Sequence, residues 1–336
     1  MNEFFEKVKQ INSKYSISQR IKSSFNGINP TLKKIALNIL PDESKLSQTA
    51  FLLHAAENEL ENPEMAVGTI VALELLRIGY EIRDKLVNKT PTFSTHFFLK
   101  DKLDMNYGLL ISDVIISKGM SYLYCNCDRR MVQHIDEAIN DIVNSRVDVA
   151  GLLKSDSLDL SKYAEMIVRS LGSVFKLGLL SIKTTAIINS QMQKSVYNLA
   201  LNFAIACEFA EDFTGFFLSS GNYDNDINTL QTENTNIIFP LLLLNEVVSG
   251  YESTTLKNIL INLKNKGGPI GHKELWRVKN LMKKYNVTDY ILRKISDHID
   301  TASAEIKVLG WRKSDEMTEF ITLLLRSNWD INYISK

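Results

Sequence analysis

Residues that break regular structure are scarce in this sequence, and their scarcity limits the folds that the chain can adopt. Fifteen glycines and six prolines occur among 336 residues, which is roughly half the usage of an average protein. A sandwich or barrel of many short strands needs a turn every few residues, so these folds are disfavoured. Long helices joined by short loops need far fewer turns. The sequence therefore predicts an all-α protein.

The spacing of apolar residues supports the same prediction. Between residues 64 and 88 no proline occurs, and apolar side chains recur every three or four residues, which is typical of a helix with a buried face. Further helices are predicted over residues 105–123, 130–149, 160–188, 194–218, 239–250, 254–264, 272–285, 288–309 and 314–329. The polar, asparagine-rich residues 220–235 are predicted to form a loop. Because no linker and no repeat divides the chain, we expect a single domain over residues 1–336.

Charge and cysteine content narrow the class of protein. Lysine and arginine together number 39, as do aspartate and glutamate, and this balance disfavours nucleic acid as the partner. Three cysteines are too few for a disulfide framework. The longest apolar run has eight residues, whereas a transmembrane helix needs about 20. We therefore expect a cytoplasmic protein with no transmembrane segment.

Acidic residues within two apolar helical segments are the strongest candidates for a functional site. Residues 64–88 and 194–218 carry them at helical spacing: Glu81, Asp84, Glu208, Glu211 and Asp212. A carboxylate in an apolar helix is costly unless it is paired, bound to a metal ion or facing water. If the two segments face each other, their oxygens could hold magnesium. Alternatively, each acidic stripe is a solvated face or is neutralised by Arg77 and Arg83.

The same two segments resemble motifs of the trans-polyprenyl diphosphate synthases. Residues 72–88, which end in D-K-L-V-N beginning at Asp84, resemble the helix of that family that ends in D-D-x-x-D. The sequence E-D-F-T-G, which begins at Glu211, is similar to the end of the second motif, F-Q-x-x-D-D-x-x-D. The 127 positions from Asp84 to Glu211 also fit the family. The resemblance extends over about residues 20–330.

This resemblance implies an isoprenoid synthase-type helical bundle with a central cavity, commonly assembled as a homodimer. In that family the acidic motifs bind magnesium ions, which hold an allylic prenyl diphosphate and draw the diphosphate away as the leaving group. By the resemblance, Mg²⁺ would be held here by five carboxylates: Asp84, Glu211, Asp212, Glu208 and Glu81. Tyr80 lies four residues before Asp84, where bulky side chains of the family form the floor of the cavity and favour short prenyl chains. Tyr80 is equally compatible with simple core packing.

Both motifs depart from the family at positions that bind diphosphate. The first keeps one carboxylate of three and has Lys85 in place of the second, and the second motif has Gly215 in place of its last aspartate. Phe93-Ser94 stands where an arginine pair is expected, and Ser170-Leu171 where a lysine–threonine pair is expected. These losses remove charges that would stabilise a leaving diphosphate. The sequence therefore predicts a degenerate active site.

Taken together, the resemblance and the departures predict a polyprenyl synthetase-like, prenyltransferase-like protein of isoprenoid biosynthesis. The first hypothesis is a non-catalytic or regulatory partner subunit of a prenyl diphosphate synthase, present as a homodimer or in a heteromer with the active enzyme. The alternatives are an altered enzyme that acts on one allylic diphosphate, as class I terpene synthases do, and a short-chain prenyltransferase. Whether the chain is itself an enzyme stays open at this point.

Overall fold

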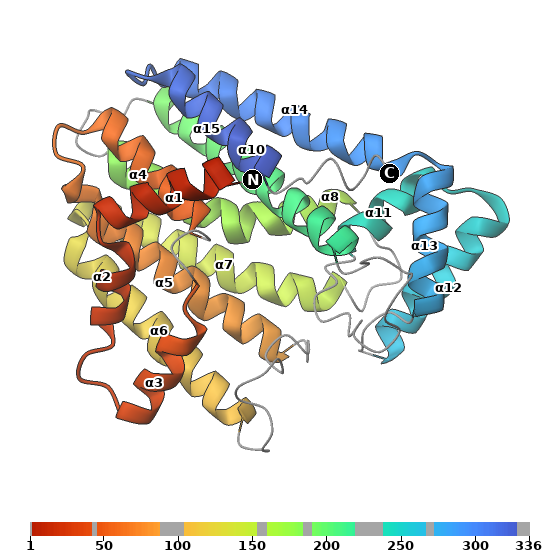
Figure 1. Ribbon diagram of the computed structural model, residues 1–336, viewed down its shortest axis with the longest axis horizontal. Coiled ribbons are helices and arrows are strands. Elements are labelled where there is room, and N and C mark those ends of the chain that lie inside the picture. The colour runs from red at the N-terminus through yellow and green to blue at the C-terminus, as the bar shows by residue number, and fades with distance from the viewer. Residues whose placement is uncertain are drawn as a thin grey trace.

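The computed structural model describes residues 2–41, 46–87, 104–152, 160–183, 190–218, 238–266 and 272–327. Within these ranges the regular elements are helices and no strand occurs, which confirms the all-α prediction (Figure 1). The α-helices are α1 (Asn2–Lys14), α2 (Ile17–Ser24), α3 (Pro30–Ile39), α4 (Ser47–Glu59), α5 (Glu64–Val87), α6 (Asp104–Asn126), α7 (Val132–Leu152), α8 (Leu160–Ile167), α9 (Ser173–Lys183), α10 (Ser190–Leu218), α11 (Ile238–Val247), α12 (Gly250–Lys266), α13 (His272–Lys284), α14 (Val287–Val308) and α15 (Ser314–Ser327). None of these helices, as far as they are described, is both long and apolar enough to cross a lipid bilayer.

The helices predicted from residue 64 onward are all present, with one interruption. Residues predicted as a single helix over 160–188 form α8, a π turn over Val168–Gly172, and α9. Helices α1 to α4 have no counterpart among the predicted helices. In α4 the reason is clear, because its residues are buried on nearly every side and so show no alternation of polar and apolar faces. The loop predicted over residues 220–235 lies outside the described residues.

Helix α9 lies at the centre of the packing, where it contacts α4, α5, α7 and α10. The ring of Phe175 in α9 meets Phe203 of α10 and Phe51 of α4 edge-on, with ring centroids 4.7 and 6.1 Å apart. The rings of Phe51 and Phe203 lie 4.3 Å apart. All three are almost completely buried, and aromatic rings in such arrangements stabilise a core beyond their apolar area. Helix α9 therefore holds α5 and α10, the two acidic helices, in one bundle.

Helices α5 and α6 pack side by side (Figure 1), and Gly79 allows them to approach closely. A Cβ atom at Gly79 would lie 2.6 Å from Cγ1 of Ile116, and 3.2 Å from the backbone nitrogen of the same residue. The side-chain atom can rotate away, whereas the backbone of α6 cannot. A side chain at position 79 would therefore push the two helices apart.

We expect Gly79→Ala to lower the free energy of unfolding by about 1–3 kcal/mol, because it overpacks the contact between α5 and α6. Gly172→Ala is the matched control, since a Cβ atom there would meet its nearest neighbours at 3.8 Å, an ordinary contact distance. Urea denaturation of both variants measures the difference. Equal stability of the two variants would contradict the close approach at Gly79.

Glu57 of α4 ties the N-terminal helix to the bundle. Its carboxylate accepts hydrogen bonds from Nζ of Lys14 at 2.6 Å and from the hydroxyl of Tyr15 at 3.0 Å. Nδ1 of His54 lies 3.5 Å from the other carboxylate oxygen. His54, and after it Lys14 and Tyr15, lower the pKa of Glu57 from 4.5 to about 2. Helix α1 is thus held by a contact whose full strength requires an ionised Glu57.

Replacing Glu57 with glutamine should destabilise the protein at neutral pH by about 1–3 kcal/mol, because hydrogen bonds to a charged acceptor are lost. The folded-state pKa lies below the unfolded-state value, so the contribution is complete above the unfolded pKa and disappears as the pH falls from about 4.5 toward 2. Melting temperatures of the wild type and of Glu57→Gln should therefore converge over that interval. Glu61→Gln, at an exposed position, is the control. A difference that does not change with pH would show that Glu57 acts by packing alone.

Candidate functional site

The acidic residues of α5 are held by an arginine of the same helix. Glu74 is buried, accepts a hydrogen bond from Oγ1 of Thr49 at 2.6 Å, and forms an ion pair with Nη2 of Arg77 at 2.6 Å. Nη1 of Arg77 donates to Oε2 of Glu81 at 2.9 Å. One guanidinium therefore binds two carboxylates, three residues before it and four residues after it. Glu81 is thus paired with Arg77, which is the arrangement expected if an arginine, and not a metal ion, neutralises this carboxylate.

Asp84 lies one turn after Glu81 on α5, and its side chain is outside those that the structure describes. Arg83, the second arginine of this segment, pairs with Asp113 of α6. Tyr80 is buried, with 8% of its surface exposed. This burial is expected both for a core residue and for a residue at the floor of a cavity, so its role at the floor stays a prediction.

The acidic residues of α10 stand in more apolar surroundings. Asp212 is completely buried, and Oδ2 accepts a hydrogen bond from the hydroxyl of Tyr163 in α8 at 2.5 Å. The ring of Tyr163 is nearly parallel to that of Phe209, with centroids 6.4 Å apart. Glu208, one turn before Asp212, is half-buried, and the side chain of Glu211 is outside the described ones. Tyr163 thus links α8 to the acidic segment of α10.

Tyr163 has no sequence signal that would identify it. It is one of several large side chains in a helical segment, and its partner lies 49 residues further along the chain. Only the packing of α8 against α10 brings the hydroxyl to the carboxylate.

A histidine of α14 lies beyond Phe209. The ring of His298 in α14 meets Phe209 edge-on at 6.0 Å, and its Nδ1 lies 2.8 Å from Oδ1 of Asn202. Burial is the main cause that lowers the pKa of His298 below its usual 6.5. The imidazole is therefore neutral near pH 7 and offers no positive charge to the acidic segment.

The position of the expected lysine–threonine pair, Ser170-Leu171, falls within the π turn between α8 and α9. The hydroxyl of Ser170 donates to the backbone carbonyl of Met166 at 2.9 Å, and so it is directed at its own helix. The neighbouring cation, Arg169, forms ion pairs with Asp148 at 2.8 Å and Glu165 at 2.6 Å. The polar groups of this turn are therefore occupied by the protein itself.

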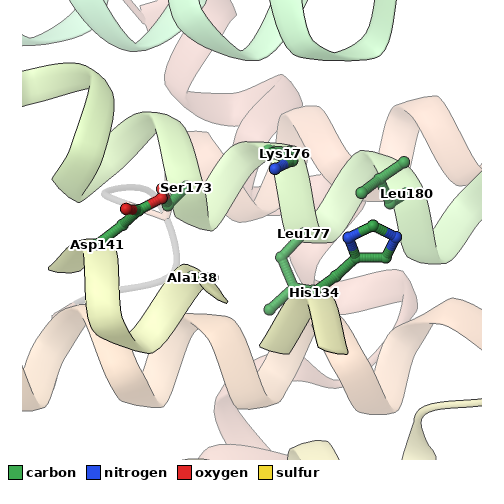
Figure 2. A pocket seen from close by; sticks show the side chains of 7 residues that line it. All are labelled: His134, Ala138, Asp141, Ser173, Lys176, Leu177 and Leu180. Carbon is green, nitrogen blue, oxygen red and sulfur yellow. Dashed lines mark hydrogen bonds between the residues drawn. The ribbon is translucent and has the colours of Figure 1, made fainter. Parts of the chain in front are cut away.

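A small hollow lies between α7 and α9, with about 180 Å³ of space that includes volume open to solvent. Figure 2 shows Asp141 beside Ser173, with His134 and Lys176 further along the same two helices. Ser173 donates to Asp141 at 3.1 Å, and Glu137 lies within 3.8 Å of both His134 and Lys176. Ser173 with Asp141 and Lys176 with Glu137 therefore form polar contacts between α7 and α9. None of the five candidate carboxylates lines this hollow, which we interpret as a packing feature.

The described side chains do not fit a multinuclear magnesium site. Among them, no group of three acidic, histidine or cysteine side chains is close enough to hold a metal ion. Oxygens of Glu81 and Asp212 face the guanidinium of Arg77 and the hydroxyl of Tyr163, and these donors compete with a cation for the same lone pairs. The prediction of Mg²⁺ bound with the help of Asp84 and Glu211 stays a prediction.

Comparison with known proteins gives a clear result only at the level of structure. No protein-family model matches the sequence, and no curated protein matches it. Geranylgeranyl pyrophosphate synthase from Lactobacillus brevis superposes with a TM-score of 0.78 at 15% identity, over 97% of this chain and 100% of that one. Decaprenyl diphosphate synthase from Rhodobacter capsulatus gives 0.77 at 12% identity with the same coverage. A polyprenyl synthase from Caulobacter crescentus, complexed with calcium and isoprenyl diphosphate, gives 0.75 at 13% identity, over 96% of this chain and 97% of that one.

The chain has the isoprenoid synthase fold. This result confirms the fold that the resemblance to the trans-polyprenyl diphosphate synthases implied. The isoprenoid synthase fold extends over nearly the whole chain.

We expect Tyr163→Phe to lower the free energy of unfolding by about 1–3 kcal/mol, because it removes a donor from a buried carboxylate and keeps the stacked ring. Tyr124→Phe, at an exposed position of α6, removes a hydroxyl without that consequence and is the control. Chemical denaturation measures both. If the two variants were equally stable, the hydrogen bond to Asp212 would contribute nothing to folding.

Proposed function

We propose that this isoprenoid synthase-fold chain acts in isoprenoid metabolism as a non-catalytic partner subunit of a prenyl diphosphate synthase. The fold supports an isoprenoid-related role. The observation that carries the non-catalytic part is the bonding of two candidate carboxylates to other groups of this chain. Glu81 is bound by Arg77, and Asp212 is buried against Tyr163.

The chemistry of diphosphate release supports this proposal. A leaving diphosphate carries about three negative charges, and metal ions and cationic side chains are what stabilise them in a dry cavity. Arg77 and Arg169 are engaged by carboxylates of this chain. Lys85 places a positive charge where the first motif would have a metal-binding carboxylate. Losses of this kind compound, because each one weakens the same transition state.

Helix α6 offers a surface for the partner subunit. Tyr107, Leu110 and Tyr124 are 37%, 52% and 53% exposed along its outer side, and the exposed residues between them include Ser117 and Ser121. The helix has few charged residues over its 23 positions. Charge-poor helical faces with exposed large apolar side chains are typical of interfaces between subunits. We propose that a prenyl diphosphate synthase subunit of the same fold covers this face.

An altered enzyme that acts on one allylic diphosphate, or a short-chain prenyltransferase, is the second candidate. In its favour, Glu208 and Asp212 lie one turn apart where the second motif falls, and the Caulobacter structure of the same fold contains calcium and isoprenyl diphosphate. This candidate depends on Asp84 and Glu211, with Tyr80 restricting the ligand to a short prenyl chain. The predicted cytoplasmic location suits either candidate.

Co-expression with a prenyl diphosphate synthase of the same genome tests the first proposal. We expect the two chains to copurify, and we expect Leu110→Arg to abolish copurification because it places a charge in the α6 face. Val143→Arg, at an exposed position of α7, changes the charge equally and should have no effect. Equal copurification of both variants would contradict the use of α6.

Calorimetric titration with geranyl and farnesyl diphosphate, with and without magnesium, separates the two candidates. The partner subunit alone should show no tight magnesium-dependent binding. Tight magnesium-dependent binding that disappears in a double variant, Asp84→Ala with Asp212→Ala, would contradict the proposal and establish the altered enzyme.

A further inference from the structure

One helix pair carries a local excess of positive charge, as does the N-terminal segment, where residues 7–41 contain seven lysines and arginines and no acidic residue. Residues 250–285, which comprise α12, α13 and the residues between and beside them, contain eight lysines and arginines against two glutamates, a formal charge of +6. The whole chain has a net charge of zero, so the remainder carries −6. The basic residues are Lys257, Lys264, Lys266, Lys273, Arg277, Lys279, Lys283 and Lys284.

The helix pair is attached to the bundle by one side. It lies at one end of the molecule, away from α1 and α2 (Figure 1), and α13 packs on α11 and α14. Val278, Leu281 and Met282 form the buried side of α13. At the junction of the pair, Glu252 of α12 accepts hydrogen bonds from Lys284 at 2.8 Å and from the hydroxyl of Tyr285 at 2.6 Å. One of the two glutamates is thus neutralised within the pair.

The other side of α13 combines an exposed aromatic ring with exposed cations. Trp276 is 56% exposed. Arg277, the next residue, and Lys283, two turns further along the helix, are also exposed. A spacing of seven residues places Trp276 and Lys283 on the same face. On α12, Lys257 is exposed and Tyr251 is 86% exposed. Each helix of the pair therefore exposes at least one cation, and the pair exposes two amphipathic rings.

We propose that the α12–α13 pair binds the surface of an anionic lipid bilayer, with Trp276 seated among the headgroups. Lysine-rich segments are attracted to anionic lipid at about 1 kcal/mol for each charge near the surface. Tryptophan and tyrosine are enriched where apolar and polar phases meet, because each has an apolar body and one polar group.

The type of basic residue favours lipid over nucleic acid as the partner. Seven of the eight cations are lysines, which act as point charges, whereas bidentate recognition of phosphates and bases is typical of arginine. This inference does not depend on the proposed function.

Co-sedimentation of the full chain with vesicles tests the proposal. The vesicles are phosphatidylcholine alone and an equal mixture with phosphatidylglycerol, in about 0.1 M salt, where charges act over about 10 Å. We expect binding to the mixed vesicles, weak binding to phosphatidylcholine alone, and release at high salt. The double variant Arg277→Glu with Lys283→Glu should bind the mixed vesicles more weakly by a factor of about ten or more. The double variant Lys9→Glu with Lys22→Glu, at exposed positions of α1 and α2, changes the net charge equally and should bind as the wild type does.

Tryptophan fluorescence reports whether the ring of Trp276 enters the headgroup region, and it can be measured on the wild type without any substitution. Mixed vesicles should shift the emission of the wild type to shorter wavelength, and Trp276→Phe should abolish the shift. Absence of binding to mixed vesicles, or equal binding by the two charge-reversal variants, would overturn the proposal. Binding to a duplex DNA or a single-stranded RNA but not to mixed vesicles would also overturn it, in favour of a nucleic acid.

Discussion

The packing of α9 between the acidic helices is the constraint on which the rest of the structure depends. Its Phe175 meets Phe203 of α10, and its Gly178 lies so close to α4 and α5 that a Cβ atom would stand 2.7 Å from Leu52 and 3.2 Å from Leu73. Interiors packed to this density transmit any displacement to their neighbours. The relative position of the α5 and α10 carboxylates is therefore determined by apolar contacts that involve no functional group.

Three carboxylates of the two acidic helices are paired with or hydrogen-bonded to other groups of this chain. A carboxylate in low-dielectric surroundings requires a donor or a cation. Arg77 supplies a cation to Glu74 and Glu81, and Tyr163 supplies a donor to Asp212. The isoprenoid synthase fold is present at only 12–15% identity to these solved structures.

Two surfaces of the molecule have opposite physical characters, and they lie at different ends of it (Figure 1). The outer side of α6 has few charges and exposed large apolar side chains, so it suits short-range association with a protein that excludes water. Residues 250–285, which include the α12–α13 pair, have a formal charge of +6, and this charge acts at longer range and is weakened by salt. Because the two surfaces are separate, the partner subunit proposed on α6 would leave the α12–α13 pair free for the proposed contact with a membrane.

The sequence by itself determined the helical class, the helices from residue 64 onward, and the contact between Arg77 and Glu81, because helical periodicity and spacings of three or four residues are local properties of the chain. Two of its acidic segments also resemble motifs of a known family, and this resemblance implied the isoprenoid synthase fold. The tertiary structure alone decided the π turn at Val168–Gly172, the all-round burial of α4, and the bond between Tyr163 and Asp212. These features depend on which helices lie side by side, and residues 49 positions apart meet only when the whole core has formed.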